Sequence, residues 1–600
     1  MMLDPAILSC AFPYKRILHY WAKASLFANP AMKYILTSAC NIPVDRKAQD
    51  KRLLFRGTFR ALAEGKAVAL FPEGTSYTEP RIMQVKDGAA WAALEYIKWA
   101  QENPDKVRDG AENVMIVPAT IVYTNKSKYR SQVIMEFGHP IRMEDHLGQF
   151  MSGEVGASRA AVKRLTAVIE RELTQSTINA PDWDTLYAAR MARDFLWLDE
   201  RSINLDDFVT ISQTLVDLFS TPDLVPNMNA IKRHLLTYYS LLESTHLTNS
   251  VLSSLPLPAT LDPRQSVPLP SRLLTLSLLV RDSIALLLPL PFFIVPLLLH
   301  APAYLMGYFG ARLAEDEEET QAQNKVVFGL LLLLMIYPAA FFFLWAFMWY
   351  TPVGALVSGS FVFLFAMYHN RLINHSYDRT KRLVAAWRVL VGVWAPKRWD
   401  LSRSAVAQYT VPRIPPENPW VDRTKLKTKS RPVTPSPTPP LTAPSTSTPA
   451  NATARPSTGS GSGKRRRPPS RRLIRHVLSA RVEAAKALAS LFTQLDRAPD
   501  GQRVRAAVHL AHAFGGGVDP PEPTLERESP DDDVPAVPEP QGWRRAREVV
   551  AFLRTHGAKF RALEAPVEGD WAALSSDGDE SESVSTSEKD DIVWVPSSQQ

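Results

Sequence analysis

The sequence predicts an α/β domain, a mixed sheet covered by helices, followed by a helical region, transmembrane helices and a disordered tail. Three features of its 600 residues predict this order. Short β-rich runs alternate with helix-like stretches in the first 175 residues, as in a sheet covered by helices. Long apolar runs follow residue 270. From about residue 412 the composition changes to proline, serine, threonine and glycine.

The first domain, residues 1–175, contains three runs with the β-branched and aromatic composition of strands. These runs are Lys66–Phe71, Val114–Tyr123 and Ser131–Gly138. Two helix-like stretches alternate with them: Asp50–Gly65, which ends in a glycine stop, and Asp87–Gln101.

Residues 176–270 are predicted to form a helical accessory region that ends in a proline-rich connector. Leu205–Phe219 and Ile231–Glu243 have helical spacing of apolar residues. Leu255–Pro270 is the connector, since its prolines interrupt regular structure.

The membrane region is predicted over residues 271–385. A helix needs about 20 apolar residues to cross a bilayer. Three segments qualify in length or composition: 284–309, which contains four prolines, 326–350, which has no charge, and the shorter 353–369. Buried core helices are the alternative, but the length and lack of charge of 326–350 favour the membrane.

Arginines on both sides of this region bear on its topology. Arg264, Arg272 and Arg281 precede the first segment, and Arg371 and Arg379 follow the third. Positive residues prefer the cytosolic side, so three full spans would separate the two groups. We therefore expect a proline-broken, re-entrant first segment and a two-span hairpin, with both large flanks cytosolic.

Charge and cysteine content narrow the class of protein. The net charge is +8, and the cysteines are Cys10 and Cys40, which excludes a disulfide framework and a cysteine-based zinc cluster. After a juxtamembrane segment, 386–411, residues 412–600 are predicted to be a largely disordered tail with a basic patch at 464–475 and an acidic end. Within the tail, Arg471–Ala498 and Trp543–Leu563 are predicted helices. The patch could bind anionic lipid; the membrane segments argue against nucleic acid.

The stretch Phe71–Ser76 reads Phe-Pro-Glu-Gly-Thr-Ser and ends a hydrophobic strand. A glycine after a strand lets a ligand approach the backbone, and the following helix offers amide donors for an anion. Lys86 lies close by in the sequence. The stretch is therefore a candidate phosphate cradle, with an ordinary strand-to-helix turn as the alternative.

Two further stretches, Asn41–Lys47 and Ile116–Ile141, make the pattern specific. Together the three resemble the glycerolipid acyltransferase family, and in particular its fungal glycerol-3-phosphate/dihydroxyacetone-phosphate branch. The family's second, third and fourth blocks stand here as Val44–Arg46, Phe71–Ser76 and Val117–Pro118. The resemblance covers residues 3–142 and implies that the first domain is an acyltransferase domain.

The resemblance implies a role for each block. Arg46 would hold the acceptor phosphate with two hydrogen bonds, although a surface ion pair with a neighbouring aspartate is the alternative. Pro118 would lie on the acyl-CoA side, or be an ordinary strand-edge proline. The acceptor site would be shaped by Glu73, Gly74, Thr75, Ser76 and Lys86.

The family's first block is a histidine, several residues, and an aspartate. The histidine is the general base for the acceptor hydroxyl, and the aspartate orients it. Asp4 matches the aspartate, but Met1 stands only three positions before it, so the histidine is missing. We expect an N-terminally truncated enzyme whose histidine lies upstream; the alternative is a catalytically inactive protein. His19, predicted in a helical context, and His139, in a turn, lack the required spacing.

Two residues depart from the family pattern. Cys40 stands where the second block usually has glycine, and we expect it to tighten the turn there. Tyr77 stands where many relatives have histidine, and it either tunes the choice of acceptor or has no role.

The resemblance implies acyl-CoA-dependent acylation of the first hydroxyl of glycerol 3-phosphate, with dihydroxyacetone phosphate as a second acceptor. This reaction begins phospholipid and triacylglycerol synthesis. Acyl-CoA would be a co-substrate, with no metal or redox cofactor. The protein would lie in the endoplasmic reticulum membrane with its catalytic domain and tail cytosolic. A 1-acylglycerol-3-phosphate acyltransferase and an inactive membrane regulator or scaffold are the alternatives.

Overall fold

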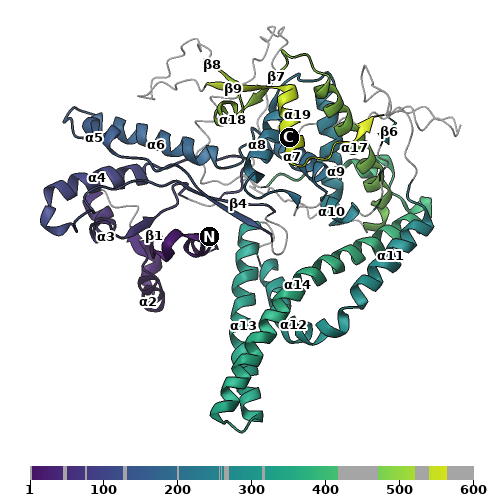
Figure 1. Cartoon of the computed structure of the whole chain (residues 1–600), viewed down its shortest axis with the longest axis horizontal. Helices are drawn as coiled ribbons and strands as arrows, with labels where there is room; N and C mark the ends of the chain where they lie inside the picture. The colour runs from purple at the N-terminus through teal and green to yellow at the C-terminus, as the bar shows by residue number, and fades with distance from the viewer. Residues whose placement is uncertain are drawn as a thin grey trace, which may run out of the picture.

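The computed structural model describes the following residues: 3–44, 51–74, 77–125, 131–198, 202–253, 255, 257, 260–262, 269–313, 318–415, 470–520 and 540–563. Figure 1 shows three parts. An α/β domain (purple to blue) lies on one side of a helical body, and long helices (teal) project away from both as a stalk.

The α/β domain contains a parallel sheet and an antiparallel strand pair. β1 (Leu18–Lys23) lies between β2 (Ile42–Val44) and β3 (Ala67–Ala69) in the parallel sheet. β4 (Ala119–Tyr123) pairs with β5 (Val133–Phe137) in antiparallel register. A single mixed sheet was predicted, so this expectation is wrong for the described residues: the two strand directions occur in separate sheets.

Prolines explain why two of these strands are shorter than predicted. The strand predicted over Lys66–Phe71 ends at Ala69, shortly before Pro72. The run Val114–Tyr123 is interrupted at Pro118, because proline has no N–H to donate to a ladder. Only Ala119–Tyr123 forms β4, although Ile116 makes an isolated bridge with Ile141.

Helices cover both faces of the parallel sheet. α1 (Leu3–Ala11) packs on the face that carries Leu18 and Tyr20. The other face carries Trp21, whose ring stacks on Phe55 at 5.6 Å and whose indole N–H donates to Thr58 Oγ1 at 2.9 Å. The helices on this side are α3 (Lys51–Ala63), α4 (Gly88–Glu102), α5 (Glu144–Phe150) and α6 (Ala157–Gln175). The helices predicted within Asp50–Gly65 and Asp87–Gln101 are confirmed.

The helical body forms from four helices that follow the α/β domain. They are α7 (Trp183–Leu196), α8 (Phe208–Ser220), α9 (Met228–Thr245) and the short α10 (Asn249–Leu252). The helices predicted from apolar spacing at Leu205–Phe219 and Ile231–Glu243 are confirmed as α8 and α9. Tyr238 of α9 is fully buried, and its hydroxyl donates to Asn249 Oδ1 at 2.9 Å.

Part of the predicted tail completes this body: the helix predicted over Arg471–Ala498 is confirmed, and the prediction of disorder is wrong over 499–520. The elements there are α17 (Ile474–Asp496), β7 (Arg503–Ala506), α18 (Val508–Ala513), β8 (Gly517–Asp519), β9 (Gln541–Arg545), α19 (Ala546–Thr555) and β10 (Ala562–Leu563). α17 buries a continuous apolar face in one core with α7, α8 and α9. β10 pairs with β6 (Thr260–Leu261), inside the predicted proline-rich connector. The Pro-, Ser- and Thr-rich composition that follows residue 412 does not extend to these segments. They carry enough apolar residues to pack in the core of the body.

The basic patch and the predicted second tail helix are corrected in the same way. Arg475, the last residue of the patch, donates to Asp400 Oδ2 at 2.7 Å and is largely buried. Residues 464–469 lie outside the described part of the chain. The helix predicted over Trp543–Leu563 is instead strand β9 followed by α19.

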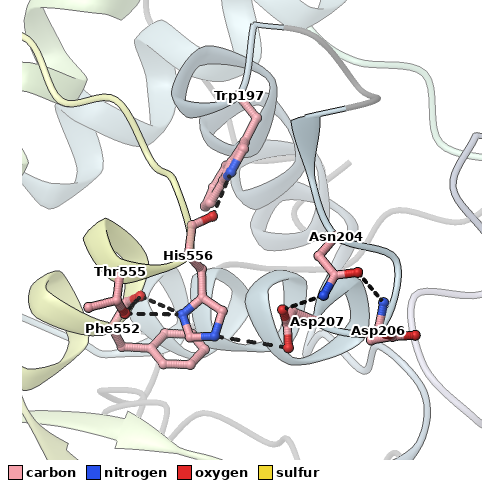
Figure 2. Close-up of polar contacts among 7 residues, drawn as sticks. All are labelled: Trp197, Asn204, Asp206, Asp207, Phe552, Thr555 and His556. Carbon is pink, nitrogen blue, oxygen red and sulfur yellow. Dashed lines mark hydrogen bonds and ion pairs between the residues drawn. The ribbon is translucent and has the colours of Figure 1, made fainter.

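Polar contacts fix α19 to the body (Figure 2). The Trp197 indole N–H donates to the His556 backbone carbonyl at 3.1 Å. His556 Nε2 lies 3.9 Å from Asp207 Oδ1, and the Asn204 side chain donates to the other Asp207 oxygen at 3.1 Å. The end of the described chain is therefore part of the folded body.

The stalk contains four consecutive helices, which project to the same side of the molecule (Figure 1). They are α11 (Arg272–Leu287), α12 (Leu290–Arg312), α13 (Glu318–Phe347) and α14 (Pro352–Trp394). Among the described residues, the last three are long and apolar enough to cross a membrane. In the most apolar window of α13 no residue is buried, which excludes the alternative of a core helix.

Two predicted membrane segments have different bounds in the structure. The segment 284–309 is broken at Pro289, which lies between α11 and α12, whereas Pro296 and Pro302 lie inside α12 and do not end it. The segment 353–369 is only the first part of α14, since no proline occurs between Pro352 and Trp394. The Trp394 indole N–H donates to Thr275 Oγ1 at 3.3 Å, which joins the end of α14 to the start of α11. Arg388 of α14 donates to the Thr245 carbonyl of the body at 2.9 Å, so these ends of the stalk lie at the body.

A buried polar cluster joins α12, α13 and α14. The rings of His300 and His369 stack with their centroids 3.7 Å apart. His300 Nε2 lies 3.0 Å from the Tyr337 hydroxyl, and His369 Nε2 lies 2.6 Å from the Tyr304 hydroxyl. Polar side chains in lipid-exposed helices are satisfied by such inward contacts.

Asp217 of α8 connects the body to the C-terminal strands. Its carboxylate accepts from the Ala507 N–H at 2.8 Å and from Gln213 Nε2 at 2.7 Å, and Arg544 lies near it. Burial nevertheless raises the pKa of Asp217 from 3.8 to about 6, because desolvation outweighs these favourable contacts.

Asp217 therefore predicts a pH dependence of stability. Between pH 3.8 and about 6 the folded chain keeps a proton that the unfolded chain loses, so stability falls as pH rises through this window. The loss amounts to about 3 kcal/mol. Asp217→Asn has no titrating group at this position and should not lose stability in this window. The free energy of unfolding of Asp217→Asn minus that of the wild type should therefore increase from pH 4 to pH 7. Unfolding of the detergent-solubilised chain at several pH values measures this difference. Asp500→Asn, which changes an exposed carboxylate, should track wild type; a constant difference for Asp217→Asn would contradict the prediction.

Candidate active site

Tyr20 connects α1 to the Phe-Pro-Glu-Gly turn. Its hydroxyl donates to the Pro5 carbonyl at 2.9 Å and lies 2.8 Å from Ser9 Oγ. Its ring stacks on that of Phe71, with centroids 6.4 Å apart and planes inclined by 9°. Burial raises the pKa of Tyr20, so the phenol stays a donor at neutral pH. One side chain therefore holds the first and third sequence blocks together.

Asp4 is held on its other side by β4. The Tyr123 hydroxyl donates to Asp4 Oδ1 at 2.6 Å. A hydrogen bond to a carboxylate is stronger than one between neutral groups, and it fixes the orientation of the acceptor. The orientation of Asp4 is thus fixed by Tyr123, which lies more than a hundred residues later in the chain. A carboxylate that orients another group needs such a fixed position.

The turn Phe71–Gly74 is closed by a second set of bonds. Gly74 has φ of +76°, a left-handed conformation that glycine adopts without strain, and its N–H donates to the Phe71 carbonyl at 3.3 Å. The Lys86 N–H donates to the Pro72 carbonyl at 2.8 Å. Gln84 accepts from Lys86 Nζ at 2.8 Å and donates to the Glu73 carbonyl at 3.2 Å. The structure therefore brings together Glu73, Gly74 and Lys86, as predicted.

Tyr77 lies against the side chain of Glu73. Its hydroxyl accepts from the Met83 N–H at 3.1 Å and hydrogen-bonds the Glu73 carboxylate. Burial, followed by the negative charge of Glu73, raises the pKa of Tyr77. Tyr77 thus fixes the carboxylate of the turn; its effect on acceptor choice stays a prediction.

Parallel strands place the second block at the same edge. β2 and β3 both run parallel to β1, so Val44 and Ala69 end at the same side of the sheet. Val44 pairs with Lys23 and Ala69 with Tyr20, so the two strand ends are two strand spacings apart across the sheet and three residues apart along it, about 14 Å in all. Side chains that follow such strand ends are typical ligand contacts. Arg46, Thr75 and Ser76 lie outside the described residues, so their predicted roles stay predictions.

Pro118 is not brought to Asp4. It immediately precedes β4, whereas Tyr123, the partner of Asp4, ends that strand; five residues of strand span about 17 Å. The Pro118 carbonyl accepts from the Gly138 N–H at 2.8 Å, and a Cβ on Gly138 would lie 3.3 Å from the Pro118 ring. The described contacts of Pro118 are those of a strand-edge proline, and its acyl-CoA role stays a prediction.

Neither candidate histidine lies beside Asp4. His19 was predicted in a helical context, which is wrong: it lies in β1, because the run Leu18–Lys23 pairs with strands on both sides. Alternate side chains point to opposite faces, so His19 faces away from Tyr20 and Pro5. His139 follows β5 at the end that pairs with the start of β4, away from Tyr123.

Cys40 lies at the end of α2 (Pro30–Ser38) with φ of +58°. Its N–H donates to the Thr37 carbonyl at 3.0 Å, and the Asn41 N–H donates to the Leu36 carbonyl at 2.9 Å. This pair of bonds is a Schellman motif with Cys40 at its left-handed position, where glycine is the preferred residue. The geometry explains why the family usually has glycine there.

Sequence reasoning missed three positioning residues, Tyr20, Tyr123 and Gln84. Tyr20 lay in a stretch that was predicted to be helical, and Tyr123 ended a predicted strand; neither pattern indicates what a hydroxyl contacts. Gln84 lies in an irregular segment with no signal. No sequence signal identifies the two tyrosines, because their contacts join residues that are far apart in the chain.

The chain is similar to known acyltransferases. Residues 1–122 match the Acyltransferase family model. The chain is 28% identical over 213 residues to glycerol-3-phosphate O-acyltransferase 2 of Saccharomyces cerevisiae, covering 36% of this chain and 27% of that protein. It is 29% identical over 167 residues to glycerol-3-phosphate O-acyltransferase 1 of the same yeast, covering 28% and 20%. An uncharacterized acyltransferase of Schizosaccharomyces pombe is 27% identical over 144 residues, covering 24% and 20%.

These matches define the N-terminal part of the chain as an acyltransferase domain. More particularly, they confirm the resemblance to glycerolipid acyltransferases of the fungal glycerol-3-phosphate branch. The chain spans about a quarter of the length of the curated relatives that it matches. No solved structure matches the chain significantly.

Replacement of Cys40 by glycine should stabilise the domain. A left-handed conformation costs a residue with a Cβ about 1 kcal/mol more than it costs glycine. Cys40→Gly should therefore raise the thermal unfolding midpoint, whereas Cys40→Ala, which removes the thiol but keeps the Cβ, should not. An equal gain for both variants would show that the thiol, and not the backbone, is the source of strain.

Removal of the Tyr123 hydroxyl should loosen α1. A hydrogen bond to a charged group contributes about 1.5–3 kcal/mol, so Tyr123→Phe should speed amide exchange in residues 3–11 roughly tenfold. Mass-spectrometric hydrogen exchange measures this, with α6 as the internal reference. Tyr34→Phe removes a hydroxyl from an exposed side chain and is the matched control. Unchanged exchange of α1 in Tyr123→Phe would mean that the Asp4 contact does not hold the helix.

Proposed function

We propose that the protein transfers a fatty acyl group from acyl-CoA to the first hydroxyl of glycerol 3-phosphate, forming lysophosphatidate. The observation that carries the proposal is that Tyr20 joins α1, the helix that contains Asp4, to the Phe71–Gly74 turn. The likeness to yeast glycerol-3-phosphate O-acyltransferases supports the choice of acceptor.

The proposed chemistry is general-base attack on a thioester. A histidine, as in the first block of the family that the chain resembles, removes the proton of the acceptor hydroxyl. Asp4, held by Tyr123, orients the imidazole and stabilises its protonated form. The acceptor oxygen attacks the thioester carbonyl, the carbon–sulfur bond breaks, and the coenzyme A thiol takes up the proton. The step needs no covalent enzyme intermediate.

The proposed acceptor site lies at the edge of the sheet where β2 and β3 end. Arg46 follows β2 by two residues and would grip the acceptor phosphate bidentately. Glu73, fixed by Tyr77, and the Gly74 backbone would contact the glycerol hydroxyls. Lys86, exposed and bonded to Gln84, would add a positive charge near the phosphate. Dihydroxyacetone phosphate, which keeps a hydroxyl and the phosphate, is the proposed second acceptor.

The proposed location is the endoplasmic reticulum membrane with the catalytic domain and body cytosolic. The stalk supports a common side for both, since α11 begins and α14 ends at the body. Acyl-CoA and glycerol 3-phosphate are both water-soluble co-substrates, and a cytosolic domain beside the membrane would pass the lipid product into the bilayer.

An acceptor comparison tests the function. The protein is expressed in cells depleted of their own acyltransferases, and their membranes receive labelled acyl-CoA with one acceptor at a time. We expect labelled lysophosphatidate from glycerol 3-phosphate and a slower reaction with dihydroxyacetone phosphate. Phosphatidate formed from lysophosphatidate alone would instead identify a 1-acylglycerol-3-phosphate acyltransferase. No product from any acceptor would support a regulator or scaffold.

Arg46 should affect acceptor binding more than turnover. Arg46→Ala removes a bidentate, charge-assisted contact worth about 1.5–3 kcal/mol, so the KM for glycerol 3-phosphate should rise roughly tenfold or more. Arg46→Lys should recover only part of this, because an ammonium cannot bind bidentately. Arg56→Ala on the exposed face of α3 is the matched control. A KM unchanged in Arg46→Ala would remove this residue from the acceptor site.

A further inference from the structure

The segment after β1 has an exposed apolar surface. It comprises η2 (Ala24–Ala28) and α2 (Pro30–Ser38), neither of which contains a buried residue. Leu26, Tyr34 and Ile35 are 48%, 76% and 56% exposed. We call these three side chains, with the exposed Lys23 and Lys33, the α2 surface. A helix with no side chain in a core needs another source of stabilisation.

The charge around the α2 surface has one sign. Residues 5–44 contain Lys15, Arg16, Lys23 and Lys33 and neither aspartate nor glutamate. An apolar face with tyrosine at its edge and lysines beside it is the composition of helices that lie in a bilayer interface. Anionic headgroups would attract the lysines.

The position of α2 identifies the partner. Figure 1 shows α2 projecting from the α/β domain toward the same side as the stalk of α12, α13 and α14. These three helices are the candidate membrane spans of the described chain. A bilayer around the stalk would therefore present its surface to the side of the domain from which α2 projects.

We propose that the α2 surface lies in the interface of the bilayer that the stalk crosses. Tyr34 and Ile35 insert at the boundary between headgroups and acyl chains, and Lys23 and Lys33 face anionic headgroups. This contact is independent of the proposed acyl transfer. It adds a second attachment point, so that the α/β domain is held against the membrane and not only tethered to it.

The surface also flanks the candidate active site. η2 leaves the sheet at the end of β1, next to the end of β2; β3 ends beside Tyr20, three residues earlier along β1. If the proposed function holds, the active site lies beside the membrane, and the lipid product has a short path into the bilayer. The experiment below does not use activity, so failure of the function and failure of the docking can be distinguished.

Depth-dependent quenching tests the contact in the full chain. Cys10→Ser and Cys40→Gly remove the native cysteines, and Tyr34→Cys then carries an environment-sensitive fluorophore in proteoliposomes that contain phosphatidylserine. Lipids with a doxyl group near the top or near the end of the acyl chain are the quenchers. Val155→Cys is the matched control, because Val155 is an exposed apolar residue between α5 and α6, which lie on the side away from the stalk.

We expect quenching at position 34 to be strongest with the shallow doxyl group, at a depth of about 5–10 Å, and to be absent at position 155. Lys23→Gln with Lys33→Gln should reduce quenching in phosphatidylserine vesicles to the level seen in neutral phosphatidylcholine. Equal quenching at positions 34 and 155 would overturn the proposal. So would a probe at position 34 that is shielded from aqueous iodide but not quenched by doxyl lipid, because a protein surface would then cover α2.

Discussion

The candidate site depends on one side chain, Tyr20. It is the point at which α1 and the turn after β3 meet: the phenol bonds the backbone of α1 and the ring packs on Phe71. It joins the helix of the first-block aspartate to the turn of the third-block glutamate, and Leu8 of α1 packs in the same cluster with Ala67 and Ala69 of β3. An acyl-transfer site needs both in fixed geometry, because the base and the acceptor must meet within hydrogen-bond distance. The parallel arrangement of β1, β2 and β3 then brings the second block to the same edge.

A continuous series of hydrogen bonds connects this site to the rest of the protein. The Ile82 N–H, in the segment that closes the turn, donates to the Asn179 side chain at 3.0 Å, and the Asn179 N–H donates to Gln213 at 2.8 Å. Gln213 bonds Asp217, which accepts from the N–H of Ala507. The C-terminal strands are thus linked through buried polar groups to the segment beside Glu73. The body is a support for the α/β domain and not a separate appendage.

The sequence predicted the α/β domain, α8, α9 and the apolar stalk because each has a strong local pattern. It also predicted that Glu73, Gly74 and Lys86 come together, since they lie in one turn. It could not predict Tyr20 and Tyr123, whose contacts join residues far apart in the chain. His19 was misassigned because its neighbours are equally suited to a helix and a strand, and pairing with β2 and β3 decided the outcome. The helix predicted over Arg471–Ala498 is present as α17, which has a clear apolar face, whereas the short strands and α18 after it were missed because a disordered composition upstream was extended past its end.

The central claim is that Asp4, held by Tyr123, orients the general base of the proposed acyl transfer. The most direct test is a double-mutant comparison in which acyl transfer to glycerol 3-phosphate is measured for the wild type, Asp4→Asn, Tyr123→Phe and the double variant. Residues that act as a unit are not additive, so we expect Asp4→Asn and the double variant to lose activity to the same extent. Full activity in Asp4→Asn, or additive losses in the double variant, would contradict it.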